Sequence, residues 1–131
     1  TYLLLRPIKI RSLLILYKLK FQLYMKIYDC FMFFDEEMLL DLRLNIMNKH
    51  VDRFVITESI YMHSGKPKKL IFDINKFSKF KDKIIYNVVD NEPPDIEVIN
   101  KNDNNDIKGS KLINNSLKRE NQQKRKQQSL S

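Results

Sequence analysis

Three consecutive segments between residues 26 and 59 constrain the fold most strongly. Residues 26–33 (KIYDCFMF) are rich in aromatic and branched side chains and short enough for a strand that is buried on both faces. Residues 36–47 open with acidic side chains and then repeat Leu and Ile at helical spacing, which predicts a helix capped by Asp35. Residues 52–59 have the composition of a second strand. Two strands joined by a helix of this length form a right-handed parallel unit, so we expect an α/β fold.

The following segments extend this unit by one strand. A short extended piece is expected at residues 70–72, followed by a short helix that Asp73 caps and that turns Phe77 and Phe80 inward. Residues 83–89 (KIIYNVV) predict the third strand, which the proline pair at 93–94 ends because proline cannot donate a backbone hydrogen bond. The sequence therefore predicts a three-stranded, mainly parallel sheet with helices.

The composition divides the chain into four parts. Residues 1–24 are expected to be a basic leader outside the domain, and Met25 is expected to open the domain at 25–99. Residues 100–109 are nearly all polar and predict a loop. Residues 110–131 predict a helix that fades into a frayed basic tail. The side chains expected to face inward from that helix are Leu112, Ile113 and Leu117.

The net charge of +8 is concentrated at the two ends of the chain. Residues 1–24 carry five basic and no acidic side chains, and residues 116–131 carry five basic side chains and Glu120. The body between them is nearly neutral, so a nucleic-acid surface on the body is not expected. The alternative function is a small basic module whose two ends bind nucleic acid or an anionic membrane.

Cysteine content and the first segment bear on the compartment. A single cysteine, Cys30, cannot close an intramolecular disulfide, so we expect a reducing compartment, the cytoplasm. The longest uncharged run in the first segment, residues 12–17, is far shorter than the roughly 20 apolar residues that cross a bilayer, so no transmembrane anchor is expected. A helix peripheral to a membrane surface is the other interpretation of this segment, because its leucines alternate with basic residues; they are Leu3, Leu4, Leu13, Leu14 and Leu16.

Several catalytic and cofactor motifs are missing from the sequence. With only Gly65 and Gly109, the chain can form neither a dinucleotide fingerprint nor a P-loop. His50 and His63 have no partners at metal-ligand spacing, and no serine lies in a nucleophile elbow. We therefore assign no catalytic residue and no metal ligand from these motifs.

Polar side chains gather where the three predicted strands end. Parallel sheets bind ligands outside the carboxyl ends of their strands, whereas the alternative is that these residues are helix caps and solvated loop residues. Glu58 requires a partner because it directly follows a buried strand, and that partner is either a ligand hydroxyl or a cation such as Arg43. The residues at the three strand ends are Asp35, Glu36, Glu58, Ser59, Asp90 and Asn91.

Three stretches of the chain resemble the amino-terminal half of glycosyltransferase family 17. They are IYDCFMFFDEEMLLDLRL at 27–44, VDRFVITESIYMHSGKP at 51–67, and RENQ at 119–122. The matching elements are a strand ending in an aromatic and acidic turn, a helix of the form E-x-x-L-L-[DE]-L-R-L, a strand V-D-x-F-V-I-x-E-S, and S-G-K-P. The resemblance covers about residues 25–122 and leaves both basic ends outside.

The resemblance implies a GT-A type fold whose Rossmann-like amino-terminal half holds a nucleotide sugar. It also implies transfer with inversion, from UDP-GlcNAc to a glycan acceptor, with Mn²⁺ or Mg²⁺ as the family's divalent metal. Phe34 would contact the base, and Glu36 or Glu58 would accept hydrogen bonds from base N–H groups or ribose hydroxyls, beside Asp35. Lys66 and Arg119 would neutralise the diphosphate, although Lys66 is equally well explained as a solvated loop charge.

The chain departs from the family pattern after Arg119. The family follows this position with a hydrophobic helix and then a strand ending in an Asp-x-Asp motif that holds the metal. Here the helix continues with polar residues, and the nearest approach to that motif is Asp95-Ile96-Glu97, which follows the proline pair. We therefore expect a truncated glycosyltransferase that is inactive alone. For Arg43 we expect a structural ion pair with Glu58 or Asp41.

Overall fold

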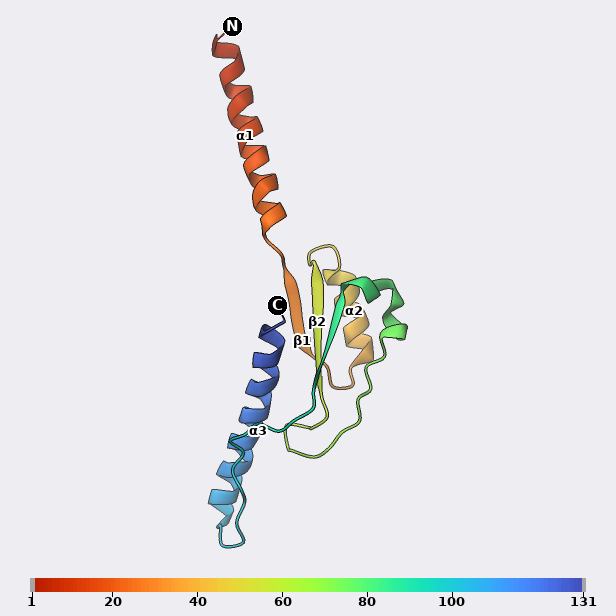
Figure 1. Ribbon diagram of the computed structural model, residues 1–131, viewed down its shortest axis with the longest axis vertical. Coiled ribbons are helices and arrows are strands. Elements are labelled where there is room, and N and C mark those ends of the chain that lie inside the picture. The colour runs from red at the N-terminus through yellow and green to blue at the C-terminus, as the bar shows by residue number, and fades with distance from the viewer. Residues whose placement is uncertain (1, 131) are drawn as a thin grey trace.

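The computed structural model describes residues 2–130, apart from the side chains of residues 2–10, Gln22 and Tyr24. Helices and strands alternate along the described chain, as Figure 1 shows. The elements in chain order are α1 (Tyr2–Tyr24), β1 (Tyr28–Met32), α2 (Glu37–Met47), β2 (Arg53–Ser59), the kinked 3-10 segment η1 (Ile74–Lys83), β3 (Ile84–Val89) and α3 (Asn105–Gln128).

The three strands form one parallel sheet in the order β1-β2-β3. Val55 in the central strand lies opposite Cys30 in β1 and Ile85 in β3. Strand β2 is buried from Phe54 to Ser59, as expected for a strand between two neighbours and under helices on both faces. The α/β prediction and the three-stranded parallel sheet are confirmed.

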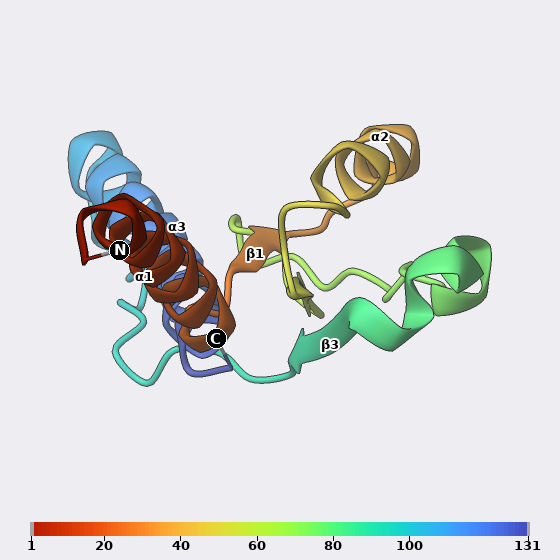
Figure 2. The same cartoon turned by 90° about the horizontal axis from the view of Figure 1, so that it is seen from above.

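Helices cover both faces of the sheet. Figure 2 shows α2 and η1 on one side and α3 on the other. The side of α2 and η1 holds the hydrophobic core, where the Phe54 and Phe80 rings meet edge to face with centroids 6.2 Å apart. Phe77 and Phe80 are both buried, as predicted. Asp73 caps the start of η1, also as predicted, by accepting a hydrogen bond from Asn75 N at 2.9 Å.

Helix α3 differs from the prediction in its length. It begins at Asn105 instead of residue 110, because the Asn104 side chain caps it by accepting a hydrogen bond from Ile107 N at 2.9 Å. It continues to Gln128, two residues beyond the predicted end of the helix at about Lys126, and the fraying of its last turns stays a prediction. Contact with the sheet holds these last turns, where Gln123 and Gln127 are buried.

The expected inward face of α3 is also wrong. Its first half lies along the connection that follows β3, where Asn115 exchanges two hydrogen bonds with the Glu97 backbone. Lys111 reaches Asp103 from the same half of the helix. Polar contacts therefore position this part of α3, and the three side chains expected to be buried are each at least half exposed: Leu112, Ile113 and Leu117.

Helix α1 projects away from the sheet (Figure 1). Every side chain described between residues 11 and 25 is exposed. Leu3 and Leu4, which contributed to the predicted surface helix, lie outside the described side chains. Among the described residues, no helix is long and apolar enough to span a membrane. The division of the chain into a leader and a domain stays a prediction.

Candidate functional site

A cavity of about 350 Å³ lies at the carboxyl ends of β1 and β2. Phe34 reaches it directly after β1, Ser59 is the last residue of β2, and Gln123 comes from α3. We call it the strand-end pocket. The residues that line it are Met32, Phe33, Phe34, Ser59, Met62, His63, Lys68 and Gln123. Its position is where parallel α/β sheets bind ligands.

Glu58 lies in the core next to this pocket and is fully buried. One carboxylate oxygen accepts from Lys68 Nζ at 2.8 Å and from Ile71 N at 2.8 Å. The other accepts from Phe72 N at 3.1 Å and from the Tyr86 hydroxyl at 2.6 Å. Protein donors therefore surround the carboxylate, which fixes the segment after β2 against the sheet. The predicted hydrogen bond from Glu58 to a nucleotide stays a prediction.

The surroundings of Glu58 shift two pKa values. Burial alone raises the pKa of the carboxyl, but hydrogen bonds from Lys68, Tyr86 and two backbone amides outweigh burial and hold this pKa below its ordinary value. Burial, together with the negative Glu58, raises the pKa of Tyr86. Glu58 is therefore ionised and Tyr86 is a neutral donor at neutral pH.

The cation beside Glu58 is Lys68, whereas the sequence suggested Arg43. Arg43 instead makes a two-pronged pair with Asp29, Nε to Oδ2 at 2.8 Å and Nη2 to Oδ1 at 2.6 Å. Arg43 meets Asp29 because the Asp29 side chain lies on the α2 side of the sheet. Asp29 is opposite Phe54, four residues before Glu58 in β2, so Arg43 lies near the start of the strands and Glu58 near their end. Arg43 is structural as predicted, with a different partner.

Lys68 is the pocket residue that sequence reasoning missed. Its ammonium lies 5.6 Å from the centroid of the half-exposed Phe34 ring, so the pocket combines an aromatic face with an ammonium group that is already paired with Glu58. The signal in the sequence was the run K-P-K-K after Gly65. Lys68 N donates to Ile60 O at 2.8 Å, which turns the chain back to the sheet at Lys68, and Lys66 at the turn stays exposed.

The turn before Lys68 is fastened to α3. Gly65 has a φ of 88°, a conformation that favours glycine, and its N–H donates to Met62 O at 2.9 Å. Arg119 Nη1 and Ser116 Oγ both donate to His63 O at 2.9 Å. A Cβ on Gly65 would lie 2.5 Å from Arg119 Nη2, so the glycine permits this close approach.

Arg119 therefore has protein partners on two sides. Its Nε also pairs with Glu92 Oε2 at 2.8 Å, and its side chain is only 11% exposed. In this structure it holds the turn that carries His63 to the strand-end pocket. Its predicted contact with a diphosphate stays a prediction.

Asp35 and Glu36 do not line the strand-end pocket. Glu36 precedes α2, and its carboxylate accepts from Phe34 N at 3.3 Å and Asp35 N at 3.0 Å. Asp35 is exposed, and the expected Asp35 cap is wrong because the helix begins one residue later than predicted, at Glu37. Of the six predicted binding residues, the structure brings Phe34 into the pocket and places Glu58 next to it.

Among the described residues, no group of three or more His, Cys, Asp or Glu side chains is placed to hold a metal ion. Asp95 and Glu97, the nearest approach to the missing motif, both lie within 3.9 Å of the Lys118 ammonium. A positive charge between these two carboxylates does not fit a cation site.

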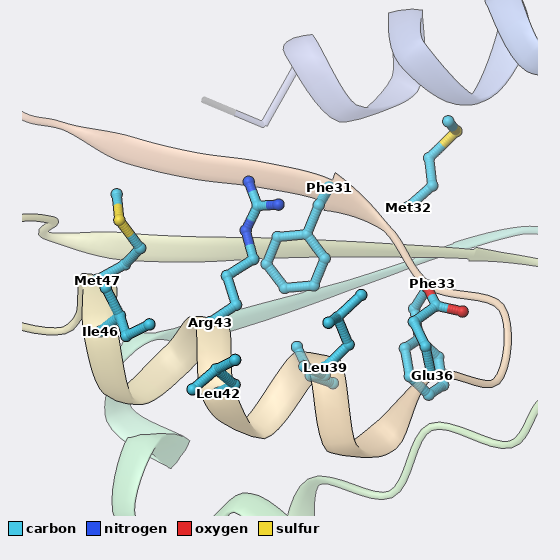
Figure 3. A pocket seen from close by; sticks show the side chains of 10 residues that line it. Phe31, Met32, Phe33, Glu36, Leu39, Leu42, Arg43, Ile46 and Met47 are labelled. Carbon is cyan, nitrogen blue, oxygen red and sulfur yellow. The ribbon is translucent and has the colours of Figure 1, made fainter.

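A second hollow, of about 420 Å³, lies between β1 and α2 (Figure 3). Leu39, Leu42 and Ile46 of α2 contribute to it, and the Arg43 guanidinium lies 4.7 Å from the centroid of the Phe31 ring. This hollow runs along the edge strand β1 beside a helix, whereas parallel sheets bind ligands at the edge formed by the carboxyl ends of their strands.

The described chain is an α/β protein with an open parallel sheet and a pocket at the carboxyl ends of two of its strands, the edge at which such sheets bind ligands. The chain belongs to glycosyltransferase family 17, whose profile matches residues 13–125. The match begins within α1, earlier than the predicted start at about residue 25, and covers the whole sheet and most of α3. No curated protein and no solved structure matches the chain.

Proposed function

We propose that this chain carries the donor-binding half of an inverting glycosyltransferase of the GT-A type. The strand-end pocket is the observation that carries this proposal, since it joins an exposed aromatic ring, an ammonium group and polar side chains at the expected edge of the sheet. Family membership supports a sugar donor and a glycan acceptor. UDP-GlcNAc is the donor we propose, following the resemblance to the N-acetylglucosaminyltransferases.

In the proposed binding mode the uracil ring stacks on Phe34. The diphosphate lies toward Lys68, which also pairs with Glu58, and toward the exposed Lys66. No ion pair in the described structure neutralises the charge of Lys66. Ser59 and Gln123 offer polar groups for the ribose hydroxyls. The chain's part in the reaction is then to bind and orient the donor.

Binding of UDP to the full chain tests this mode. Because stacking of a base on an aromatic ring contributes about 1–3 kcal/mol, Phe34→Ala should weaken UDP affinity by about 5- to 150-fold in a calorimetric titration. Phe21→Ala, which removes an exposed ring from α1, is the matched control and should leave the affinity unchanged. Equal affinity in wild type and Phe34→Ala would refute stacking on Phe34.

We also propose that the 131-residue chain does not transfer sugar by itself. The carboxylates of Asp95 and Glu97 are already next to a lysine, and the described residues hold no metal-binding group for the diphosphate. Incubation with UDP-GlcNAc, manganese and a glycan acceptor should give no product by mass spectrometry. Transfer above the level of a buffer control would show that this proposal is wrong.

For the compartment we propose the cytoplasm. The sequence has a single cysteine, which suits a reducing environment. Thiol labelling of the protein in intact and lysed cells tests this placement, since an exported chain would be labelled from outside.

A further inference from the structure

Helix α1 exposes a large amount of apolar surface. The large apolar side chains described in it are 50–82% exposed, and they include Leu13, Leu14, Ile15, Leu16, Phe21 and Leu23. Figure 1 shows the helix extending from the sheet instead of packing on it. An isolated helix gains most of its stability by burying an apolar surface, so α1 requires a partner that covers these side chains.

The charge of this helix selects the kind of partner. Arg11, Lys18 and Lys20 are exposed, and the whole segment from residue 1 to residue 24 contains no acidic side chain. A partner that complements α1 must therefore be both anionic and able to take up leucine and phenylalanine side chains. The surface of a bilayer that contains anionic lipids has both properties.

We propose that α1 binds the surface of an anionic lipid bilayer and holds the glycosyltransferase sheet next to it. The apolar side chains enter the boundary between head groups and acyl chains, and the cations remain with the lipid phosphates. Arg11 and Lys18 are seven residues apart and share a face, whereas Lys20 lies on the opposite side. Long lysine and arginine side chains reach the head groups from either side, because their aliphatic stems can run along apolar surface.

Two alternatives fit the helix less well. Nucleic acid would pair with the three cations, but it offers no apolar phase for six or more exposed aliphatic and aromatic side chains. An orientation across the bilayer would bring basic residues to its centre, where charge is costly. A helix lying in the surface turns Arg11 and Lys18 toward the head groups, and Lys20 reaches them from the other side of the helix along its aliphatic stem.

Vesicle flotation of the full chain tests the proposal. The protein should float with vesicles of phosphatidylcholine mixed with phosphatidylglycerol and remain behind with phosphatidylcholine alone. The triple variant Arg11→Glu, Lys18→Glu and Lys20→Glu should bind the anionic vesicles at least about 100-fold less, since each basic residue near such a surface contributes about 1 kcal/mol and the new carboxylates are repelled. The control Lys49→Glu, Lys81→Glu and Lys101→Glu has the same net charge, alters exposed lysines outside α1, and should still float.

A second set of variants separates lipid from nucleic acid and from a folding defect. The chain has no tryptophan, so Leu16→Trp provides a single reporter on α1, with Val98→Trp as its counterpart on the body. The emission of Leu16→Trp should shift to the blue on adding anionic vesicles, and that of Val98→Trp should not. The proposal is overturned by unchanged flotation of the α1 triple variant, by an unshifted Leu16→Trp signal, or by binding to RNA in place of vesicles.

Discussion

At the scale of single residues, Glu58 joins three parts of the fold. It lies in β2, pairs with Lys68 after the turn, and receives the Tyr86 hydroxyl from β3. Two backbone amides complete its partners, so one carboxylate fixes the extended segment that follows the turn. That segment carries Lys68, and the shape of the strand-end pocket therefore depends on Glu58.

Replacement of Glu58 by glutamine should destabilise the protein strongly. The substitution would leave the nearly buried Lys68 ammonium without its counter-ion. It would also turn the NH₂ group of the glutamine toward N–H or O–H groups that now donate to the carboxylate. We expect the free energy of unfolding to fall by about 3–5 kcal/mol in urea titrations, the usual cost of breaking a buried ion pair. Glu37→Gln, which removes an exposed pair with Lys76, is the control and should change little. A small effect at Glu58 would mean that its network is not a stabilising one.

The stability difference between wild type and Glu58→Gln should depend on pH. The pKa of Glu58 in the folded state lies below its ordinary value of 4.5, so its contribution to stability is complete above that pH and is lost as pH falls through the folded-state pKa. The difference in unfolding free energy between wild type and Glu58→Gln should therefore narrow on acidification below pH 4.5. Carboxyls common to both proteins cancel in this comparison. A difference that stays constant or widens would contradict the assigned shift.

At the scale of elements, the docking of α3 on the turn at residues 62–66 builds one side of the pocket. The helix supplies Ser116 and Arg119 to the same carbonyl of His63, and Gly65 lets them approach. The two glycines of the chain report separately on this contact and on the helix itself.

Gly65→Ala should weaken the docking of the turn on α3. The new Cβ would lie 2.5 Å from Arg119 Nη2, and a φ of 88° disfavours alanine, so we expect a loss of stability of about 1–3 kcal/mol. Gly109→Ala, inside α3 with no atom within 4 Å of the new Cβ, should stabilise the protein by about 0.5–1 kcal/mol. Thermal unfolding of both variants checks the signs. A stabilising Gly65→Ala would show that the turn is not held as described.

The elements differ in how far the sequence predicted them. Periodicity within residues 26–59 was sufficient for the strand–helix–strand unit, because each pattern is local. The inward face of α3 was predicted wrongly because burial there follows polar contacts with distant segments, such as Asn115 with Glu97. The partner of Glu58 was missed for the same reason, since the turn that brings Lys68 back to the sheet is a tertiary feature.

At the scale of the whole molecule, the strand-end pocket and the proposed membrane helix are separate. The pocket lies where β1 and β2 end, whereas α1 enters the sheet at the opposite end of β1 (Figure 1). Family membership and the sheet order agree with the sequence motifs at 27–44 and 51–67. The binding roles of individual residues could not be derived in the same way, because identical motifs serve as helix caps, ion pairs or ligand contacts.

The most direct test of donor binding is a titration of the full chain with UDP, followed through backbone amide chemical shifts. We predict saturable changes that are largest around the strand-end pocket, at Phe34, Ser59, His63, Lys68 and Gln123. The absence of saturable changes, or changes confined to the basic residues of α1 and the end of α3, would contradict a nucleotide site at this edge of the sheet.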